Sequence, residues 1–169
     1  MLGERLLVAP VFAESGTVTY YVPTGRWTNL LSGATVEGPG WREERHPYSS
    51  LPLLVRPNSV LPIGDCEARA DYDYPRGVTL RAYAIEDGAR VRVSVPAQNG
   101  EPGSIFELQR DGRQLRLTPH AAAPGWRLLL VGETVESVNG GAIETTAEGS
   151  LVVPASTDAI VALTLSRHA

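Results

Sequence analysis

The side chains that most often perform catalysis or bind metals are sparse in this sequence. Its three histidines, His46, His120 and His168, are far apart, and none has a partner at the short spacing typical of zinc sites. The single cysteine, Cys66, has no neighbouring histidine to activate it as a nucleophile, and it cannot form an internal disulfide. We therefore expect structural or surface roles for all four residues, and no metal or other cofactor.

Acidic residues suggest two further kinds of chemistry. Asp71 and Asp73 in the segment DYDY would project to one side of an extended chain, but a calcium site needs about six to eight oxygen ligands. Hydrolysis of a glycosidic bond needs two carboxyl groups facing one bond across a pocket. The nineteen acidic residues instead lie mainly beside turns or alternate with arginine. We expect DYDY to be a solvated segment anchored by its tyrosines, and we predict no catalytic residue.

Aromatic side chains are the remaining candidates, because exposed aromatic rings can stack on sugars. A tryptophan beside a turn commonly closes the end of a small β core, and we expect this role for Trp27 and Trp126. Trp41 directly follows the Gly-Pro-Gly sequence at 38–40 and so stands at the exit of a loop. For Trp41 both roles stay open, and it is the one predicted carbohydrate contact.

These residues lie on a chain whose turns predict an all-β protein. Thirteen prolines and seventeen glycines are spread along its length, which is typical of many short strands. Residues 5–12, RLLVAPVF, form an apolar run of the kind that is buried on both faces. In YYVPTGRWTNLLSG, Pro23 and Gly25 cannot both lie inside a regular strand. We therefore expect a hairpin there, with a second short strand at 27–31.

The strand pattern lapses over the polar residues 64–77. Beyond this segment the alternation is cleaner, and Asp87-Gly88 and Asp111-Gly112 are typical hairpin turns. The sequence predicts two consecutive antiparallel β-sandwich domains, at 1–70 and 78–169, joined by a linker at 71–77.

Composition excludes several partners. The net charge is −4, and the fifteen basic residues are all arginines, scattered without the cluster that a phosphate backbone requires. No window of about 18 apolar residues suggests a membrane span, and no secretory signal is visible. We expect no nucleic-acid or membrane partner and a cytoplasmic location.

Four sequence blocks resemble one family in both order and spacing. GERLLVAPVF, YYVPTGRWTNLLSG, GPGW and LPLLVRPNSVLPIG resemble the region that follows the catalytic barrel in glycoside hydrolase family 31, which contains α-glucosidases and α-xylosidases. The resemblance covers residues 3–64, and RADYDYPRGVTLRAYAIEDG looks like the start of the distal domain in the α-xylosidase-like branch. It implies a proximal C-terminal β-sandwich at 1–70 and a distal one at 78–169.

The same resemblance implies a function without catalysis. The family's two catalytic aspartates lie on the barrel, and no position of this sequence matches them. The chain would then be the non-catalytic C-terminal part of a retaining α-glycosidase, bracing the (β/α)8 barrel and supporting association. Two alternatives stay open. One is a stand-alone carbohydrate-binding module that uses Trp41; the other is an oligomerisation unit whose exposed apolar patch includes part of LLVAPVF.

Overall fold

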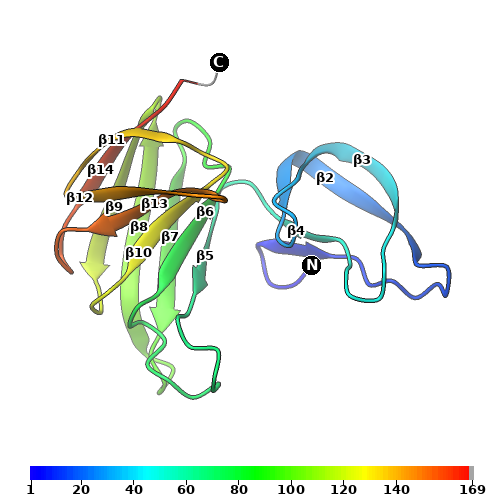
Figure 1. Ribbon diagram of the computed structural model, residues 1–169, viewed down its shortest axis with the longest axis horizontal. Helices are drawn as coiled ribbons and strands as arrows, with labels where there is room; N and C mark the ends of the chain where they lie inside the picture. Colours follow the sequence, from blue (N-terminus) through cyan, green and yellow to red (C-terminus); the bar gives the residue numbers. More distant parts are fainter. Residues whose placement is uncertain (168–169) are drawn as a thin grey trace. The chain divides into compact units, whose positions relative to one another are not determined.

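The computed structural model describes residues 1–167, and these contain fourteen β-strands and no helix (Figure 1). The strands form one four-stranded sheet and two five-stranded sheets. The chain forms two compact units, Met1–Ser59 and Val60–Ala169. The predicted all-β class is confirmed.

The first unit is an antiparallel sheet with the strand order β1-β4-β2-β3. Its strands are β1 (Leu6–Val8), β2 (Thr17–Asn29), β3 (Thr35–Arg45) and β4 (Leu53–Val55). One face of β2 carries Val18, Tyr20 and Val22 toward the core, as the alternation in the sequence predicts. The core of this unit consists of Leu7, Ala9, Tyr20, Val22, Trp27 and Leu54.

The hairpin predicted at Pro23 and Gly25 is wrong. β2 runs through both positions and pairs with β3 on either side of them, with a register shift between Val22 and Gly25. The two intervening residues form a β-bulge, which allows a ladder to continue past a residue that cannot donate to it. Gly25 has a φ of 118°, a value that disfavours any side chain. Pro23 and Gly25 therefore mark an irregularity within one long strand and not a turn between two strands.

The predicted buried strand at 5–12 is also wrong over its second half. β1 spans only Leu6–Val8 and pairs with β4, and Leu7 and Ala9 enter the core. Pro10 has no amide hydrogen for the ladder, so pairing ends there. Phe12 is 91% exposed. The apolar run therefore consists of a buried strand followed by an exposed loop.

The second unit is a β-sandwich of two five-stranded sheets, β12-β13-β10-β6-β5 and β11-β14-β9-β8-β7 (Figure 1). A hydrophobic core with residues from both sheets, Leu80, Phe106, Leu117 and Leu128 among them, lies between them. The strands of the first sheet are β5 (Ser59–Ile63), β6 (Thr79–Tyr83), β10 (Arg127–Val131), β12 (Gly141–Thr146) and β13 (Gly149–Pro154). Those of the second are β7 (Arg90–Pro96), β8 (Pro102–Asp111), β9 (Gln114–Ala121), β11 (Val135–Asn139) and β14 (Val161–Leu165).

Two details of this sandwich differ from the sequence prediction. β6 and β10 pair in parallel, with Leu80 opposite Leu128, so the sheet is mixed. The turn at Asp87-Gly88 joins strands of different sheets, β6 and β7, and does not close a hairpin. The turn at Asp111-Gly112 does close the predicted hairpin, between β8 and β9. The positive φ of Gly88, 75°, is compatible with a hairpin turn and with a connection between two sheets. The local sequence therefore cannot distinguish these two connections.

The two compact units meet between Ser59 and Val60. β5 is hydrogen-bonded to β6, and Val60 belongs to the core of the sandwich. Residues 64–77 form the connection between these two strands, inside the second unit. The domain limits 1–70, 71–77 and 78–169 remain a proposal.

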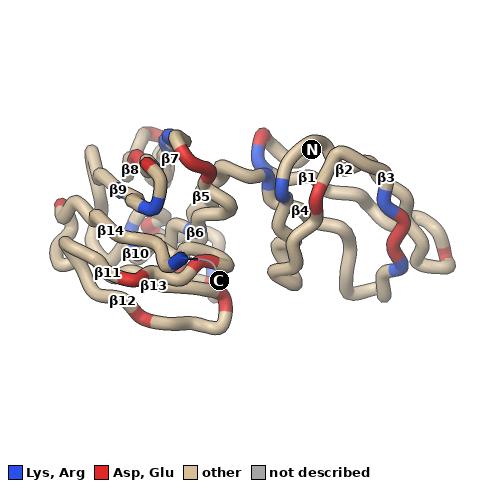
Figure 2. Tube along the Cα trace, turned by 90° about the horizontal axis from the view of Figure 1, so that it is seen from above, with Lys and Arg blue, Asp and Glu red and all other residues tan. Residues whose placement is uncertain are grey.

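Charged residues of both signs are interspersed along both units (Figure 2). Among the described residues, no helix has the length and hydropathy needed to cross a membrane.

Candidate docking surface

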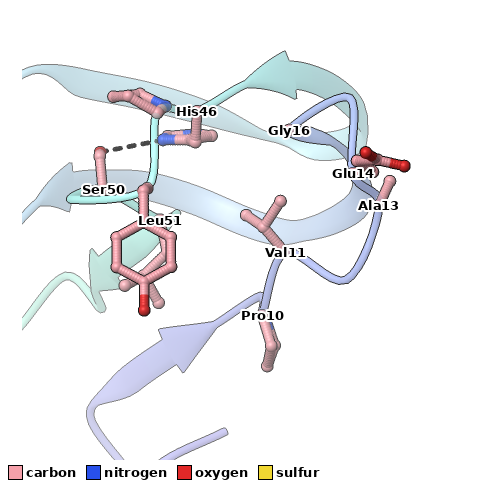
Figure 3. A pocket seen from close by; sticks show the side chains of 10 residues that line it. Pro10, Val11, Ala13, Glu14, Gly16, His46, Ser50 and Leu51 are labelled. Atoms are coloured by element: carbon pink, nitrogen blue, oxygen red, sulfur yellow. Dashed lines mark hydrogen bonds between the residues drawn. The ribbon is translucent and has the colours of Figure 1, made fainter.

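A hollow of about 550 Å³ lies in the first unit, between the loop that leaves β1 and the loop that enters β4. Its lining residues fall between Pro10 and Gly16 and between His46 and Leu51 (Figure 3). The two loops are held together by the sheet, because β1 pairs with β4. Backbone hydrogen bonds from Ala9 to Pro52, 3.1 Å, and from His46 to Gly16, 2.9 Å, join them further. The hollow is thus a fixed feature of this fold.

Gly16 is the residue that lets the two loops approach so closely. A Cβ atom at this position would lie 2.4 Å from the carbonyl oxygen of His46, and the φ of Gly16 is 77°. Both conditions favour glycine. The glycine that precedes β2 is thus required where the two loops meet at the hollow.

Two aromatic side chains beside this hollow are exposed. Tyr48, which lines the hollow, is fully exposed, and Phe12 is 91% exposed. Tyr48 lines the hollow together with Val11 and Leu51, whereas Phe12 follows Val11 in the chain and is not among the lining residues. Large exposed aromatic residues beside an apolar hollow are typical of protein interaction sites. We refer to Val11, Phe12, Tyr48 and Leu51 with their hollow as the docking surface.

A chain of hydrogen bonds lies beneath the docking surface. The Tyr20 hydroxyl donates to Glu44 at 2.7 Å, and the other oxygen of Glu44 meets Nε2 of His46 at 2.8 Å. Nδ1 of His46 meets the Ser50 hydroxyl at 3.0 Å, the bond drawn in Figure 3. The His46 side chain is only 12% exposed. The network therefore ties β2, β3 and the loop of Tyr48 together.

The order Ser, His, Glu also occurs in hydrolases, where the acid orients the base and the base activates the serine. Catalysis of that kind needs free amide groups that stabilise an oxyanion. The two nearby amides of Gly16 and Ser50 donate to the carbonyls of Ala13 and Pro47 instead. We assign the network a positioning role for the loop. The sequence predicts a structural or surface role for His46 but not the network, because the link from Tyr20 to Glu44 depends on the pairing of β2 with β3.

Burial strongly perturbs one member of the network. Loss of hydration raises the pKa of Tyr20 above its ordinary value, and the hydrogen bond to Glu44 raises the pKa further. The phenol therefore stays neutral and continues to donate to the carboxylate well into the alkaline range.

The three tryptophans divide between core and surface. Trp27 and Trp126 are 2% and 0% exposed, and their Nε1 atoms donate to the carbonyls of Pro23, 3.0 Å, and Thr157, 2.8 Å. Trp41 is 72% exposed on β3. It lies opposite Tyr21 of β2, with ring centroids 5.5 Å apart and planes at 68°. Trp41 and Tyr21 form what we call the aromatic pair, on the face of the sheet that carries Thr19 and Glu43.

The roles expected for the other predicted positions stay predictions. Cys66 is a free, partly exposed thiol, His120 is exposed, and His168 lies outside the described residues. In DYDY, Tyr72 and Tyr74 contact each other edge to face at 4.9 Å, and Tyr74 packs against the sandwich core. No group of three potential ligands that could hold a metal occurs within residues 1–167.

Family models match both units. The glycosyl hydrolase family 31 C-terminal domain matches residues 1–61, and the α-xylosidase YicI C-terminal domain matches residues 73–165. The chain therefore belongs to glycoside hydrolase family 31 and represents its C-terminal region. More closely, it is a C-terminal region of the α-xylosidase-like type, as the sequence blocks predicted.

Curated relatives and solved structures agree with this assignment. The chain is 34% identical over 113 residues to α-xylosidase XylQ of Lactiplantibacillus pentosus, covering 65% of this chain and 15% of that protein. It is 46% identical over 71 residues to an α-xylosidase of Emericella nidulans, and the match covers 37% of this chain and 9% of that protein. The chain thus spans a small fraction of the curated relatives that it matches.

Solved structures share the fold. A protein of Listeria monocytogenes, lmo2446, has a TM-score of 0.79 at 19% identity over 98% of this chain and 18% of its own. A family 31 dextranase of Flavobacterium johnsoniae has a TM-score of 0.71 at 15% identity, over 97% of this chain and 26% of its own.

Proposed function

We propose that this chain is a non-catalytic part of a retaining α-glycosidase of the α-xylosidase or α-glucosidase type, which hydrolyses O-glycosyl bonds in carbohydrate metabolism. Its first unit would brace the catalytic (β/α)8 barrel in the cytoplasm. The observation that supports bracing is the docking surface, where Phe12 and Tyr48 are exposed beside an apolar hollow.

The docking surface has the chemistry of a permanent interface. Full burial of a side chain the size of Phe contributes about 1.5 to 3 kcal/mol relative to leaving it exposed. Such contacts are stabilising when the partner is rigid and the aromatic residues are held in place. The network from Tyr20 to Ser50 provides that rigidity beneath Tyr48.

A chimeric enzyme tests the bracing role. This chain would replace the matching C-terminal region of XylQ, and thermal stability and α-xylosidase activity would be measured. We expect the double substitution Phe12→Ser, Tyr48→Ser to lower the melting temperature of the chimera, because the apolar contact to the barrel is lost. Trp41→Ser, which removes an exposed aromatic elsewhere on the unit, is the matched control. Equal loss in both variants would contradict a specific docking surface.

The absence of catalysis is tested on the chain alone. Turnover of aryl α-xylosides and α-glucosides should equal that of buffer. Measurable hydrolysis that disappears when one carboxylate of this chain is replaced by its amide would contradict the proposal.

A second candidate function, a carbohydrate-binding module, is favoured by the aromatic pair. Trp41 presents most of its ring to solvent and is braced edge-on by Tyr21. A sugar ring can stack on such a surface, and the neighbouring Glu43 supplies a hydrogen-bond acceptor on the same face.

Tryptophan fluorescence distinguishes this function from bracing. Trp27 and Trp126 are buried, so a change on titration with xylo- or gluco-oligosaccharides would report on Trp41. We expect saturable quenching in the native chain and none in Trp41→Ala. An unchanged spectrum at saturating oligosaccharide would exclude the module.

A further inference from the structure

The second unit has a hollow of its own, on the face of sheet β12-β13-β10-β6-β5 that points away from the core. Its volume is about 270 Å³. The lining combines two arginines, Arg81 and Arg127, with the apolar side chains of Leu129 and Leu151. Glu148 lies at the edge of the same hollow. All these residues belong to the second unit, so this site does not depend on the docking surface.

Strand pairing brings the two arginines together. In the parallel ladder, Arg81 lies opposite Leu129 and Thr79 lies opposite Arg127. Residues two apart on a strand share a face, so both guanidinium groups project to the outer side of the sheet. The mixed pairing that the sequence did not predict is thus what creates the arrangement.

Both arginines have a buried donor without an acceptor. The Nε atoms of Arg81 and Arg127 are shielded from solvent and make no hydrogen bond within the described part of the chain. The hydroxyl of Tyr83, on the same face of β6, is also shielded from solvent and makes no hydrogen bond within the described part of the chain. Burial raises the pKa of Tyr83, so this hydroxyl stays a neutral donor. Buried polar groups without partners are rare in proteins and point to a missing ion, water or ligand.

The charges at the hollow specify the missing partner. Two guanidinium groups face one carboxylate, because Arg81 pairs with Glu148. The two orphaned arginine atoms are donors, whereas the Tyr83 hydroxyl can donate or accept. The Nε edge of an arginine can bind a planar oxyanion through two parallel hydrogen bonds. A volume of about 270 Å³ is smaller than that of most drug-sized sites and corresponds to about nine water molecules.

We propose that this hollow is a binding site for a small oxyanion, the carboxylate or phosphate group of a molecule no larger than one sugar acid. Arg127 is the principal ligand, because it has no carboxylate partner in the hollow. Arg81 is shared between the ligand and Glu148. A neutral sugar would offer acceptors to the donors but no negative charge to balance the second guanidinium group.

Calorimetric titration of the full chain tests the proposal at constant ionic strength. The probes are inorganic phosphate and D-glucuronate, which separate the two sources of the anion, with D-glucose as the neutral control. We expect saturable binding of at least one anion and none of glucose. Arg127→Gln should weaken that binding about tenfold, the effect of losing one charge-assisted hydrogen bond. Arg116→Gln, an exposed arginine of β9, is the charge-matched control and should leave affinity unchanged.

A second variant keeps the test independent of folding defects. Glu148 is 55% exposed, so Glu148→Gln should fold normally, and it frees Arg81 for the ligand. We expect this variant to bind the anion at least about twofold more tightly. Equal weakening by Arg127→Gln and Arg116→Gln, or no saturable response up to about 100 mM of either anion, would overturn the proposal. Failure of this test leaves the bracing function untouched.

Discussion

Trp27 and Trp41 lie on neighbouring strands of the same sheet, yet their surroundings are opposite. Trp27 is 2% exposed and hydrogen-bonded to the backbone, whereas Trp41 is 72% exposed and contacts only the edge of Tyr21 among aromatic side chains of the described residues. Trp27 is part of the core of the fold, whereas the ring of Trp41 is accessible to a ligand.

Alanine substitution should separate the two roles. We expect Trp27→Ala to lower the free energy of unfolding by about 3 to 5 kcal/mol, because a large buried ring is replaced by a cavity and the Pro23 carbonyl loses its donor. Trp41→Ala should change it by less than about 0.5 kcal/mol. Urea unfolding followed by circular dichroism measures both values. A large loss for Trp41→Ala would mean that the aromatic pair is structural.

Two of the six tyrosines should titrate late. Burial raises the pKa of Tyr20 and of Tyr83 above the ordinary value of about 10. Spectrophotometric titration of the phenolate band should therefore show a late component in the native chain that is absent in urea. Tyr20→Phe and Tyr83→Phe should each remove part of it. A titration of the native chain that matches the unfolded one would contradict the buried positions.

The same shifts make stability depend on pH at the alkaline end. A raised pKa in the folded state means that the unfolded chain releases its phenolic protons first. Above pH of about 10 the native state binds more protons than the unfolded state, so the free energy of unfolding falls as pH rises. Below that pH these two residues contribute no pH dependence. Tyr20→Phe should flatten the alkaline part of the stability curve.

At the scale of elements, the β-bulge in β2 determines how the first unit bends. Gly38 of β3 faces the bulge, and a Cβ atom there would lie 1.9 Å from the Pro23 carbonyl oxygen. Gly40, two residues along the same strand, has no atom within 4 Å of its ideal Cβ position. The two glycines pair with the residues on either side of the bulge, Gly25 and Val22, but only Gly38 is crowded by the backbone of β2.

Alanine at these two glycines tests the bulge directly. We expect Gly38→Ala to destabilise the chain by about 2 kcal/mol or more, because the backbone of β2 must move away. Gly40→Ala should be close to neutral. Thermal unfolding of the two variants gives the comparison. Similar melting temperatures would show that β2 and β3 do not approach as closely as the structure indicates.

The elements also show what a sequence alone can determine. Local alternation correctly placed the core face of β2 and the hairpin at Asp111-Gly112. It failed at Pro23 and at Asp87-Gly88, because a bulge and a sheet-to-sheet crossing use the same residues as a hairpin turn. The distinction depends on which strands pair, and pairing between residues distant in the sequence leaves no local signal.

The candidate sites also depend on pairing between residues that are distant in the sequence. The exposure of Trp41 could be suspected from its place after a loop, and the family blocks identified the region. In the network, Tyr20 and Glu44 are 24 residues apart in the sequence. Glu44 and His46 are two residues apart, on either side of the end of β3. The hollow around Arg81 and Arg127 depends on a parallel ladder. Neither could be predicted before the strand order was known.

At the scale of the whole molecule, each compact unit has its own core and its own candidate surface. The hollow of the first unit is mainly apolar, with Glu14 and His46 in its lining, while that of the second is lined by two arginines and one glutamate beside apolar residues. Different partners are expected for surfaces of such different chemistry: an apolar protein face for one and a small anion for the other.

An apolar docking surface without its partner should promote association between copies of the chain. Phe12 and Tyr48 are almost fully exposed, and covering them with a second copy removes both aromatic rings from water. Sedimentation velocity over a range of concentrations should show reversible association that is reduced in Phe12→Ser, Tyr48→Ser. Trp41→Ser removes an exposed aromatic from the other candidate surface and should leave association intact. If the chain stays monomeric at high concentration, the docking surface is too small to hold a protein partner by hydrophobic contact alone. If Trp41→Ser abolishes association instead, the aromatic pair is the interface, and the assignment of bracing to the loops at 10–16 and 46–51 fails.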